Sequence, residues 1–399
     1  MGSHAQKKFR AFLHLVFFVV GISIGISFSL YFKSFLFLLK ASIISNVSLQ
    51  APPFILLQPP SLPQQSTPSP PPPPLSPLPP LPPPPPAAAA EIKPSLMHNM
   101  EDEELFSRAS LVPKTVREFP NRPLPKVAFM FLTKGPIPLS PLWEIFFKGH
   151  EELYNIYVHR HPSFIDSTPD NSVFNGRSIP SQLVEWGTST MMDAERRLLG
   201  NALLDSSNER FILLSESCIP LFNFTTIYSY LINSHKSFTG SFDDPSKVGR
   251  GRYNPKMSPT ISLSDWRKGS QWFEVNRKLA LEIISDTKYY PVFREHCNMP
   301  CYIDEHYIPT LINILRPEEN SNRSVTWVDW SRAGPHPGRF VRNDVSAEFL
   351  NRIRSGTSNC TYNGNTTTLC FLFARKFVPN TLQPLLQFAP LLLNTSVQV

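Results

Sequence analysis

Strand-like and helix-like patterns alternate along the C-terminal part of the chain. Runs of apolar and β-branched residues predict strands, and apolar residues that recur every three or four positions predict helices. In chain order we predict a strand at 126–135, a helix at 141–150, a strand at 154–161, a helix at 191–205, a strand at 210–221 and a helix at 272–286. This alternation predicts an α/β fold with a mainly parallel sheet. Ligands of such folds bind at the carboxyl ends of the strands, where the polar stretches LTKG, VHRH and SESC lie.

A longer apolar run lies near the N-terminus, at residues 11–32. It carries no formal charge apart from His14, and as a helix at about 1.5 Å per residue it would be long enough to cross a bilayer core. Lysine and arginine in the tail 1–10 favour a cytosolic N-terminus. The run is longer than the apolar region of a cleaved signal peptide, and no clear cleavage site follows it. We therefore predict a transmembrane signal anchor at 11–32 and a lumenal body.

Proline dominates the region after this run. Residues 52–86 hold 19 of the 43 prolines of the chain. Proline lacks a backbone donor, so this stretch favours an extended polyproline spacer and cannot build a core. An acidic stretch, EDEEL, follows at 101–105. We predict that 33–120 is a largely disordered lumenal stem and that 121–399 is the globular catalytic domain.

The net charge is +7 and the sequence pI is about 9.1. The basic residues are scattered and accompany no nucleic-acid motif, so no nucleic-acid partner is predicted. An anionic small ligand or a membrane surface would suit this charge equally well. Behind an anchor, the Asn-x-Ser/Thr sequons indicate a lumenal body. We predict glycosylation at five of them, while Asn46 lies too close to the membrane: Asn223, Asn322, Asn359, Asn365 and Asn394.

Five cysteines give an odd count. Cys360 and Cys370 bracket a nine-residue loop, and we predict a disulfide between them in an oxidising lumen. Cys297 and Cys301 are also close enough to pair, and the sequence leaves that pairing open. Cys218 then stays free and buried. No second ligand pair follows Cys297 and Cys301 at a suitable spacing, so we predict no metal site.

Several common catalytic motifs are absent. The chain contains no G-x-G-x-x-G, no G-x-x-x-x-G-K-[ST], no G-x-S-x-G and no H-E-x-x-H. Their absence removes the usual signals of dinucleotide redox chemistry, P-loop chemistry, α/β-hydrolases and zinc proteases.

Six stretches occur instead in one order, and together they are highly specific. They are VEWGTSTMMDAERRLL at 184–199, LLSESCIPL at 213–221, KGSQWFEVNRKLA at 268–280, DEHYIP at 304–309, VDWSRAGPHP at 328–337 and LFARKF at 372–377. The chain resembles the core-2/I-branching β-1,6-N-acetylglucosaminyltransferase family, glycosyltransferase family 14, in its plant branch. The resemblance runs from about Val127 to Phe377. A single anchor and a proline-rich stem match the layout of Golgi type II glycosyltransferases.

This resemblance implies a GT-A-like fold and an inverting transfer from a UDP-sugar, with no cofactor and no divalent cation. SFDDP offers Asp243 and Asp244, but adjacent aspartates do not make the D-x-D metal motif. Fixed cations can neutralise the departing diphosphate in place of a metal. The resemblance assigns this role to Lys376 with Arg375. For a further cation four arginines compete, and we take the last of them: Arg332, Arg339, Arg352 and Arg354.

The resemblance assigns Glu305 as the catalytic base that takes the proton from the acceptor hydroxyl. The structural alternative is a salt-bridged glutamate at a helix start, with Asp304 as a helix cap. We expect Asp304 to support or cap, and His306 to pack or orient a neighbour and not to bind a metal.

Four more residues are candidates for sugar or substrate binding. Glu216 lies in a turn after a predicted strand, where it can bond sugar hydroxyls or cap the next segment. Trp186 and Trp330 offer aromatic faces on which a sugar ring can stack, although core packing is the common role of a tryptophan. His159 ends the second predicted strand, where animal relatives carry an aspartate that contacts the nucleoside. This departure leaves the uridine contact open.

Two functions of different classes fit these observations. The first is a Golgi-anchored, inverting, metal-independent transferase that builds β-linked branches on wall polysaccharide or glycoprotein glycans. Its partners are a UDP-sugar donor, with GlcNAc or glucuronic acid as the sugar, a glycan acceptor and the Golgi membrane. The second is a catalytically inactive lumenal protein that keeps the fold as a sugar-binding or scaffolding module.

Overall fold

The structure is a computed structural model, and it describes residues 96–112, 124–165, 168–332, 334, 336–356 and 359–394. The predicted cytosolic tail, the signal anchor at 11–32 and the proline-rich run at 52–86 lie outside these ranges. Among the residues that are described, no helix has the length and apolar character needed to cross a membrane.

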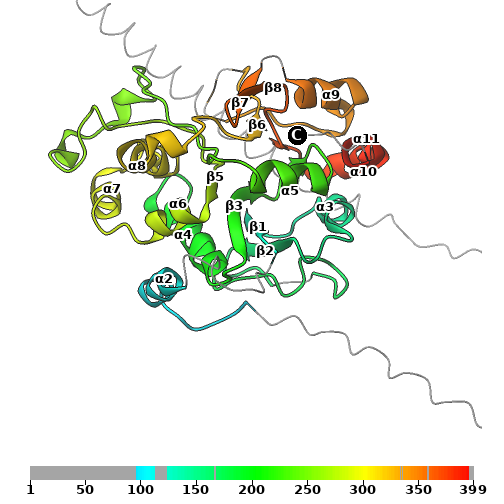
Figure 1. Ribbon diagram of the computed structural model, residues 1–399, viewed down its shortest axis with the longest axis horizontal. Helices are drawn as coiled ribbons and strands as arrows, with labels where there is room; N and C mark the ends of the chain where they lie inside the picture. The colour runs from blue at the N-terminus through cyan, green and yellow to red at the C-terminus, as the bar shows by residue number, and fades with distance from the viewer. Residues whose placement is uncertain are drawn as a thin grey trace, which may run out of the picture. The chain divides into compact units, whose positions relative to one another are not determined.

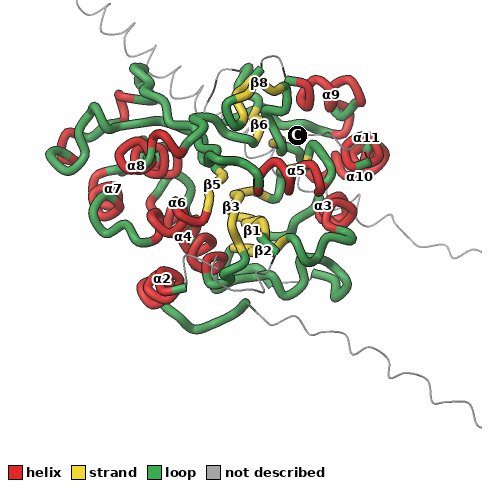
Figure 2. The backbone as a smooth tube through the Cα atoms, in the orientation of Figure 1, coloured by secondary structure: helices red, strands yellow, loops and turns green. Residues whose placement is uncertain are grey.

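A four-stranded sheet forms the centre of the described fold, in the order β2-β1-β3-β5 (Figures 1 and 2). Its strands are β1 (Lys126–Leu132), β2 (Tyr154–His159), β3 (Asn208–Ser215) and β5 (Glu274–Asn276). β1 pairs in parallel with both β2 and β3, whereas β5 is antiparallel to β3. The predicted α/β fold with a mainly parallel sheet is therefore confirmed.

The alternation of side chains along β1 explains the layers on the two faces of the sheet. Val127, Phe129 and Phe131 face a core that includes helices α3 (Ser140–Phe147) and α5 (Phe224–Ile232). Ala128 and Met130 face a second core with α4 (Ser189–Leu203) and α6 (Arg277–Ile284). Both cores are needed because a strand with a period of two buries side chains on each face. Figure 1 shows the sheet between these helix pairs.

A second sheet joins the C-terminal part of the chain to this frame. Its order is β4-β9-β6, made of β4 (Ile219–Pro220), β9 (Phe373–Arg375) and β6 (Thr326–Val328). β9 is antiparallel to β4 and parallel to β6. Because β4 follows β3 after a short turn, this sheet brings residues 373–376 to the carboxyl end of β3.

The other elements surround these two sheets. The remaining helices are α2 (Asp102–Leu111), α7 (Tyr290–His296), α8 (Tyr307–Leu315), α9 (Ala347–Ser355), α10 (Leu382–Gln387) and α11 (Ala389–Leu393). A hairpin of β7 (Cys360–Tyr362) and β8 (Asn365–Thr367) forms the third sheet. Short 3-10 turns include η2 (Arg250–Arg252) and η4 (Ile303–Glu305).

Two predicted elements differ from the structure. The predicted strand at 210–221 is two strands, β3 and β4, because the chain turns at Glu216 and the Cys218 N–H donates to the Ser215 carbonyl. The predicted helix at 272–286 begins as strand β5 and becomes helix α6 only at Arg277. Asn276 ends the strand and caps the helix by accepting a hydrogen bond of 2.9 Å from the Leu279 N–H.

The folded part also extends upstream of the predicted boundary at residue 121. Helix α2 lies in the segment that we assigned to the stem, and three acidic residues occupy its first turn, where the helix dipole favours negative charge. Leu105 and Ala109 are buried, and Asp102 accepts two hydrogen bonds from Arg197 of α4. The stem prediction is therefore wrong for α2 and stays a prediction for the residues outside the described ranges.

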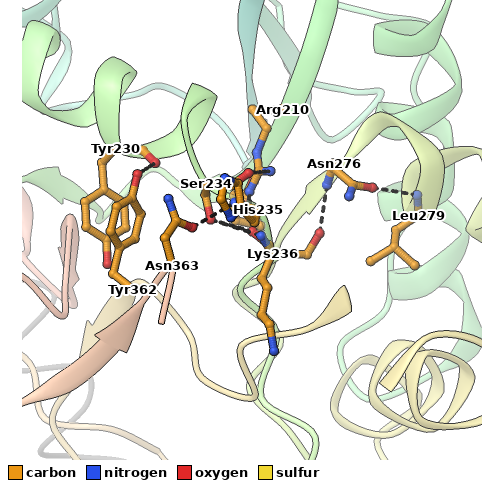
Figure 3. A network of polar contacts seen from close by, with 11 residues as sticks. Arg210, Tyr230, Ser234, His235, Lys236, Asn276, Leu279, Tyr362 and Asn363 are labelled. Atoms are coloured by element: carbon orange, nitrogen blue, oxygen red, sulfur yellow. Dashed lines mark hydrogen bonds and ion pairs between the residues drawn. The ribbon is translucent and has the colours of Figure 1, made fainter. Parts of the chain in front are cut away.

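A polar network connects the β7–β8 hairpin to the start of β3. This is the end of the sheet opposite to the carboxyl end of β3. Arg210 donates to the Ser234 and Lys236 carbonyls, and Asn363 bonds the same loop through the His235 N–H (Figure 3). Tyr362 stacks near Tyr230, with ring centroids 4.1 Å apart. These contacts stabilise this end of the sheet and leave the carboxyl ends of the strands open for chemistry.

Candidate functional site

Two adjacent cations lie at the carboxyl end of β9. Arg375 is 9% exposed, and its guanidinium carbon lies 3.8 Å from the centre of the Trp272 ring. Lys376 is fixed through its backbone, because its carbonyl accepts from the Phe340 N–H at 2.9 Å. Burial, and then the charge of Arg375, lowers the pKa of Lys376, while Glu216 opposes that shift. Within the described part of the chain neither cation forms a salt bridge.

Glu216 is half-buried and follows β3 directly. Its charge acts on both Arg375 and Lys376, so the structure brings three of the predicted site residues together. Cys218 lies near Arg375, and burial raises the pKa of its thiol. Cys218 is free and buried, as predicted.

A cavity of about 470 Å³ lies next to these cations. Its lining includes three arginines, Arg332, Arg339 and Arg352, and three acidic residues, Asp329, Asp344 and Glu348. The charge of Arg339 also lowers the pKa of Lys376, and the Phe340 N–H contacts the Lys376 carbonyl. Three of the four competing arginines therefore line one cavity, and the charge of one of them, Arg339, acts on Lys376.

Arg354, the arginine that we chose from the sequence, has other contacts. It lies on α9, donates to the Leu391 carbonyl at 2.9 Å and places its guanidinium 4.7 Å from the Phe222 ring centre. Its role as a diphosphate ligand gains no support from these contacts. Arg339 is the better candidate, because its charge acts on Lys376.

Glu305 ends the 3-10 turn η4 and lies between two cations. Its Oε2 accepts from Arg252 Nη1 and from Lys268 Nζ, each at 2.7 Å. Burial alone would raise the pKa of Glu305, but Lys268 and Arg252 outweigh burial and hold that pKa below the usual value. The Glu305 carboxyl is therefore ionised at neutral pH.

Neither Lys268 nor Arg252 was assigned a role from the sequence. Lys268 begins the KGSQWFEV stretch, and Gly269 after it donates its N–H to the Glu305 carbonyl at 2.8 Å. A Cβ at Gly269 would lie 2.0 Å from the Gly240 carbonyl oxygen. The glycine therefore allows this close approach and helps to hold Lys268 at the Glu305 carboxylate.

The neighbours of Glu305 are buried. Asp304 is 6% exposed and lies against Glu195 of α4, a residue that the sequence reading did not single out. Asp304 caps no helix, since neither η4 nor α8 has a capping side chain. His306 stacks on Trp266 with ring centroids 4.4 Å apart, and its Nδ1 lies 2.8 Å from the Arg267 carbonyl. His306 is a packing and orienting residue, as predicted.

An aromatic wall lies beside Glu305, and we define it as Trp186, Tyr302 and His336. The ring centroid of Trp186 is 5.0 Å from that of Tyr302 and 5.4 Å from that of His336. Trp186 is 47% exposed, so it is not a core tryptophan. Tyr302 also lies under the Arg252 guanidinium, 4.5 Å away, which links the wall to the partners of Glu305. Trp330 is 55% exposed and lies on the loop that carries His336.

His159 ends β2 but its ring is only 1% exposed. Its Nε2 accepts from the Gln182 N–H at 3.3 Å. Burial, followed by the charge of Arg197, lowers the pKa of His159 to about 3, so the ring is neutral at physiological pH. The predicted contact of His159 with substrate stays a prediction.

The disulfides and sequons lie away from these groups, apart from one bridge. Cys360 pairs with Cys370 across the β7–β8 hairpin, and Cys297 pairs with Cys301 directly before Tyr302. Asn223 is half-buried and caps α5 by accepting from the Thr226 N–H. The other four predicted glycosylation sites are exposed: Asn322, Asn359, Asn365 and Asn394.

Comparison with known proteins agrees with this geometry. The family model of the core-2/I-branching enzyme matches residues 127–354, which include β1, Glu305 and the arginine-lined cavity. The chain belongs to the core-2/I-branching enzyme family of glycosyltransferases. It is 36% identical over 309 residues to "Glycosyltransferase BC10" of Oryza sativa subsp. japonica, which covers 65% of this chain and 76% of that relative. The resemblance that the six stretches indicated is therefore confirmed, and the mixed α/β fold is consistent with a GT-A-like domain.

Proposed function

We propose that this glycosyltransferase transfers a sugar from a UDP-sugar to a glycan hydroxyl with inversion and without a metal ion. The acceptor oxygen attacks the anomeric carbon while the bond from that carbon to the diphosphate oxygen breaks. The acceptor proton passes to Glu305, and UDP leaves with the bonding electron pair. Arg375, Lys376 and Arg339 bind the departing diphosphate.

One observation carries this proposal: Arg375, which is buried, and Lys376, which is half-buried, are adjacent and form no salt bridge within the described residues. A buried charge is costly unless a counter-charge compensates it. Glu216 supplies one negative charge nearby, which leaves an excess of positive charge that a diphosphate would neutralise. The position at the carboxyl end of β9, beside the end of β3, is where α/β folds bind ligands.

Glu305 meets two requirements of a base. It is ionised at neutral pH, and it is 25% exposed, so an acceptor hydroxyl can reach it. The aromatic wall beside it offers the Trp186 face for the apolar side of a pyranose ring. GlcNAc and glucuronic acid both remain candidate donor sugars.

A second candidate function rests on the two ion pairs of Glu305. Lys268 and Arg252 lower its pKa and so weaken it as a base. A glutamate with two salt bridges also fits a structural role, in a catalytically inactive protein that binds sugars. Only a kinetic measurement separates the two functions.

The membrane topology belongs to the same proposal. A Golgi type II arrangement would place 1–10 in the cytosol, 11–32 in the Golgi membrane and the folded part in the lumen. The two disulfides and the exposed sequons support an oxidising lumenal compartment.

The test uses the full-length glycosylated protein in detergent. Binding and hydrolysis are measured across a panel of UDP-sugars in EDTA and in Mn²⁺, for wild type, Glu305→Gln and Lys376→Ala. We expect binding in EDTA that weakens in Lys376→Ala, and turnover that is lost in Glu305→Gln. Turnover that requires Mn²⁺ would overturn the metal-free account. Binding without turnover in the wild type, toward any glycan acceptor offered, would favour the inactive sugar-binding protein.

A further inference from the structure

Two buried carboxyl groups lie behind Glu305 and take no part in the reaction proposed above. Glu195, on α4, is fully buried, and Asp304, in η4, is 6% exposed. Helix α4 packs against η4, and the charge of Asp304 acts on Glu195. Burying one carboxylate is costly, and burying a second whose charge acts on the first is more so.

Few polar groups compensate this pair. Glu195 Oε1 accepts from Gln271 Nε2 at 2.8 Å. Glu195 Oε2 and Asp304 Oδ1 are both buried, and neither has a hydrogen-bond partner within the described residues. The nearby cations, Lys268 and Arg252, make their ion pairs with Glu305 and act on Asp304 only through space.

We propose that Glu195 and Asp304 form a carboxyl pair next to Glu305 and that this pair holds one proton at neutral pH. Both are positioning residues, and the charge of Asp304 makes Glu305 a stronger base. This inference rests on the proposed function, because it needs Glu305 to accept a proton. Glu195 stays neutral, and Asp304 releases its proton to solvent as the pH rises.

The order of ionisation follows from burial and charge. Burial, and then the charge of Glu305, raises the pKa of Asp304 to about 6. Burial, and then the charge of Asp304, raises the pKa of Glu195 well above its usual value. Asp304 therefore ionises first. A negative charge next to Glu305 opposes Lys268 and Arg252 and raises the proton affinity of Glu305.

The pair also predicts how activity depends on pH. We would measure kcat/KM for hydrolysis of UDP-GlcNAc, and of UDP-glucuronic acid, from pH 5 to 8 with the full-length protein. In the wild type, kcat/KM should rise through about pH 6, by roughly threefold to tenfold, as Asp304 ionises. Asp304→Asn should be flat at the lower level. Glu195→Gln, which mimics the protonated acid, should keep the rise.

A second measurement does not depend on activity. Because the folded-state pKa of Asp304 is raised, its contribution to stability is present at low pH and is lost as the pH rises through about 6. The Tm of the wild type should therefore fall between pH 5 and 7.5 relative to the Tm of Asp304→Asn. The Tm of Glu195→Gln should fall less over this pH range than the Tm of the wild type. This second variant keeps the test valid if Asp304→Asn folds poorly.

The outcomes separate this inference from the proposed function. Parallel Tm curves for the wild type and both variants would overturn the carboxyl pair. Diverging Tm curves with an unchanged kcat/KM rise in Asp304→Asn would overturn its coupling to Glu305. If the wild type turns over no UDP-sugar, the proposed function fails together with the coupling, and diverging Tm curves would still support the pair.

Discussion

Two buried arginines near opposite ends of β3 have opposite kinds of partners. At the start of β3, Arg210 makes two hydrogen bonds to the buried Glu274, at 2.7 and 2.8 Å, and donates to two backbone carbonyls. Near the carboxyl end of β3, Arg375 of β9 is also buried, but it stacks on Trp272 and has no salt bridge within the described residues. The first arrangement is complete without a ligand. The second leaves positive charge that a ligand can compensate, so a buried cation without an ion pair marks the candidate diphosphate site, whereas Glu305 is paired with both Arg252 and Lys268.

The largest expected effect tests the ion pair of Arg210 with Glu274 near the start of β3. Arg210→Ala leaves the Glu274 carboxylate buried without its partner, so we expect a loss of about 3–5 kcal/mol in the free energy of unfolding. Chemical denaturation of the purified protein measures it. Arg250→Ala is the matched control, since it removes an exposed ion pair with Asp243 and should leave the stability nearly unchanged. Equal effects of the two variants would contradict the comparison.

The next largest effect is catalytic and concerns Glu305. Glu305→Gln keeps the size of the side chain but cannot accept the acceptor proton, so kcat should fall by at least about 100-fold with little change in donor KM. Asp243→Asn serves as a control for loss of a surface carboxylate. A variant that loses Tm while keeping its kcat would instead make Glu305 a structural partner of Lys268 and Arg252.

Lys376 sharpens the comparison, because its removal should affect binding and stability differently. Lys376→Ala should raise the Kd for UDP by about tenfold, since one charge-assisted contact to the diphosphate is lost. Its Tm should stay equal or rise, because a half-buried charge without a salt bridge within the described residues has been removed. Isothermal titration and thermal unfolding measure the two effects, with Lys278→Ala as the surface-lysine control. A clear drop in the Tm of Lys376→Ala would show that Lys376 stabilises the fold as Arg210 does.

Much of the fold could be predicted from the sequence, because β1 and β2 are continuous apolar runs and α4 has a clear helical period. The errors occur where a short pattern is ambiguous. Strand β5 has only three residues, Glu274–Asn276, and the helical pattern across 272–286 conceals it. The turn at Glu216 divides one apolar run into β3 and β4, and neither apolar flank signals it.

The site could be predicted only where a local motif carries it. Glu305 and Lys376 follow from the resemblance. Their partners do not follow, because Lys268 and Arg252 lie 37 and 53 positions from Glu305 in sequence and meet it only through tertiary packing. The choice of Arg354 over Arg339 gains no support from the structure, for a similar reason. Charge alone does not tell which of the four arginines in 332–354 acts on Lys376.

The smallest expected effect concerns the aromatic side chains, which repeat the contrast between complete and open environments. Trp143 is fully buried among other rings, and its Nε1 donates to the Cys218 carbonyl, whereas Trp186 exposes 47% of its surface beside Glu305. Trp186→Ala should therefore leave the Tm nearly unchanged and raise the acceptor KM by about threefold to tenfold, the value of one stacking contact. Trp186→Phe keeps a ring and should recover most of that loss. Steady-state kinetics with the donor identified in the panel and a glycan acceptor that supports turnover would measure both variants. An unchanged acceptor KM in Trp186→Ala would remove the aromatic wall from the site and leave its exposure without a role in binding.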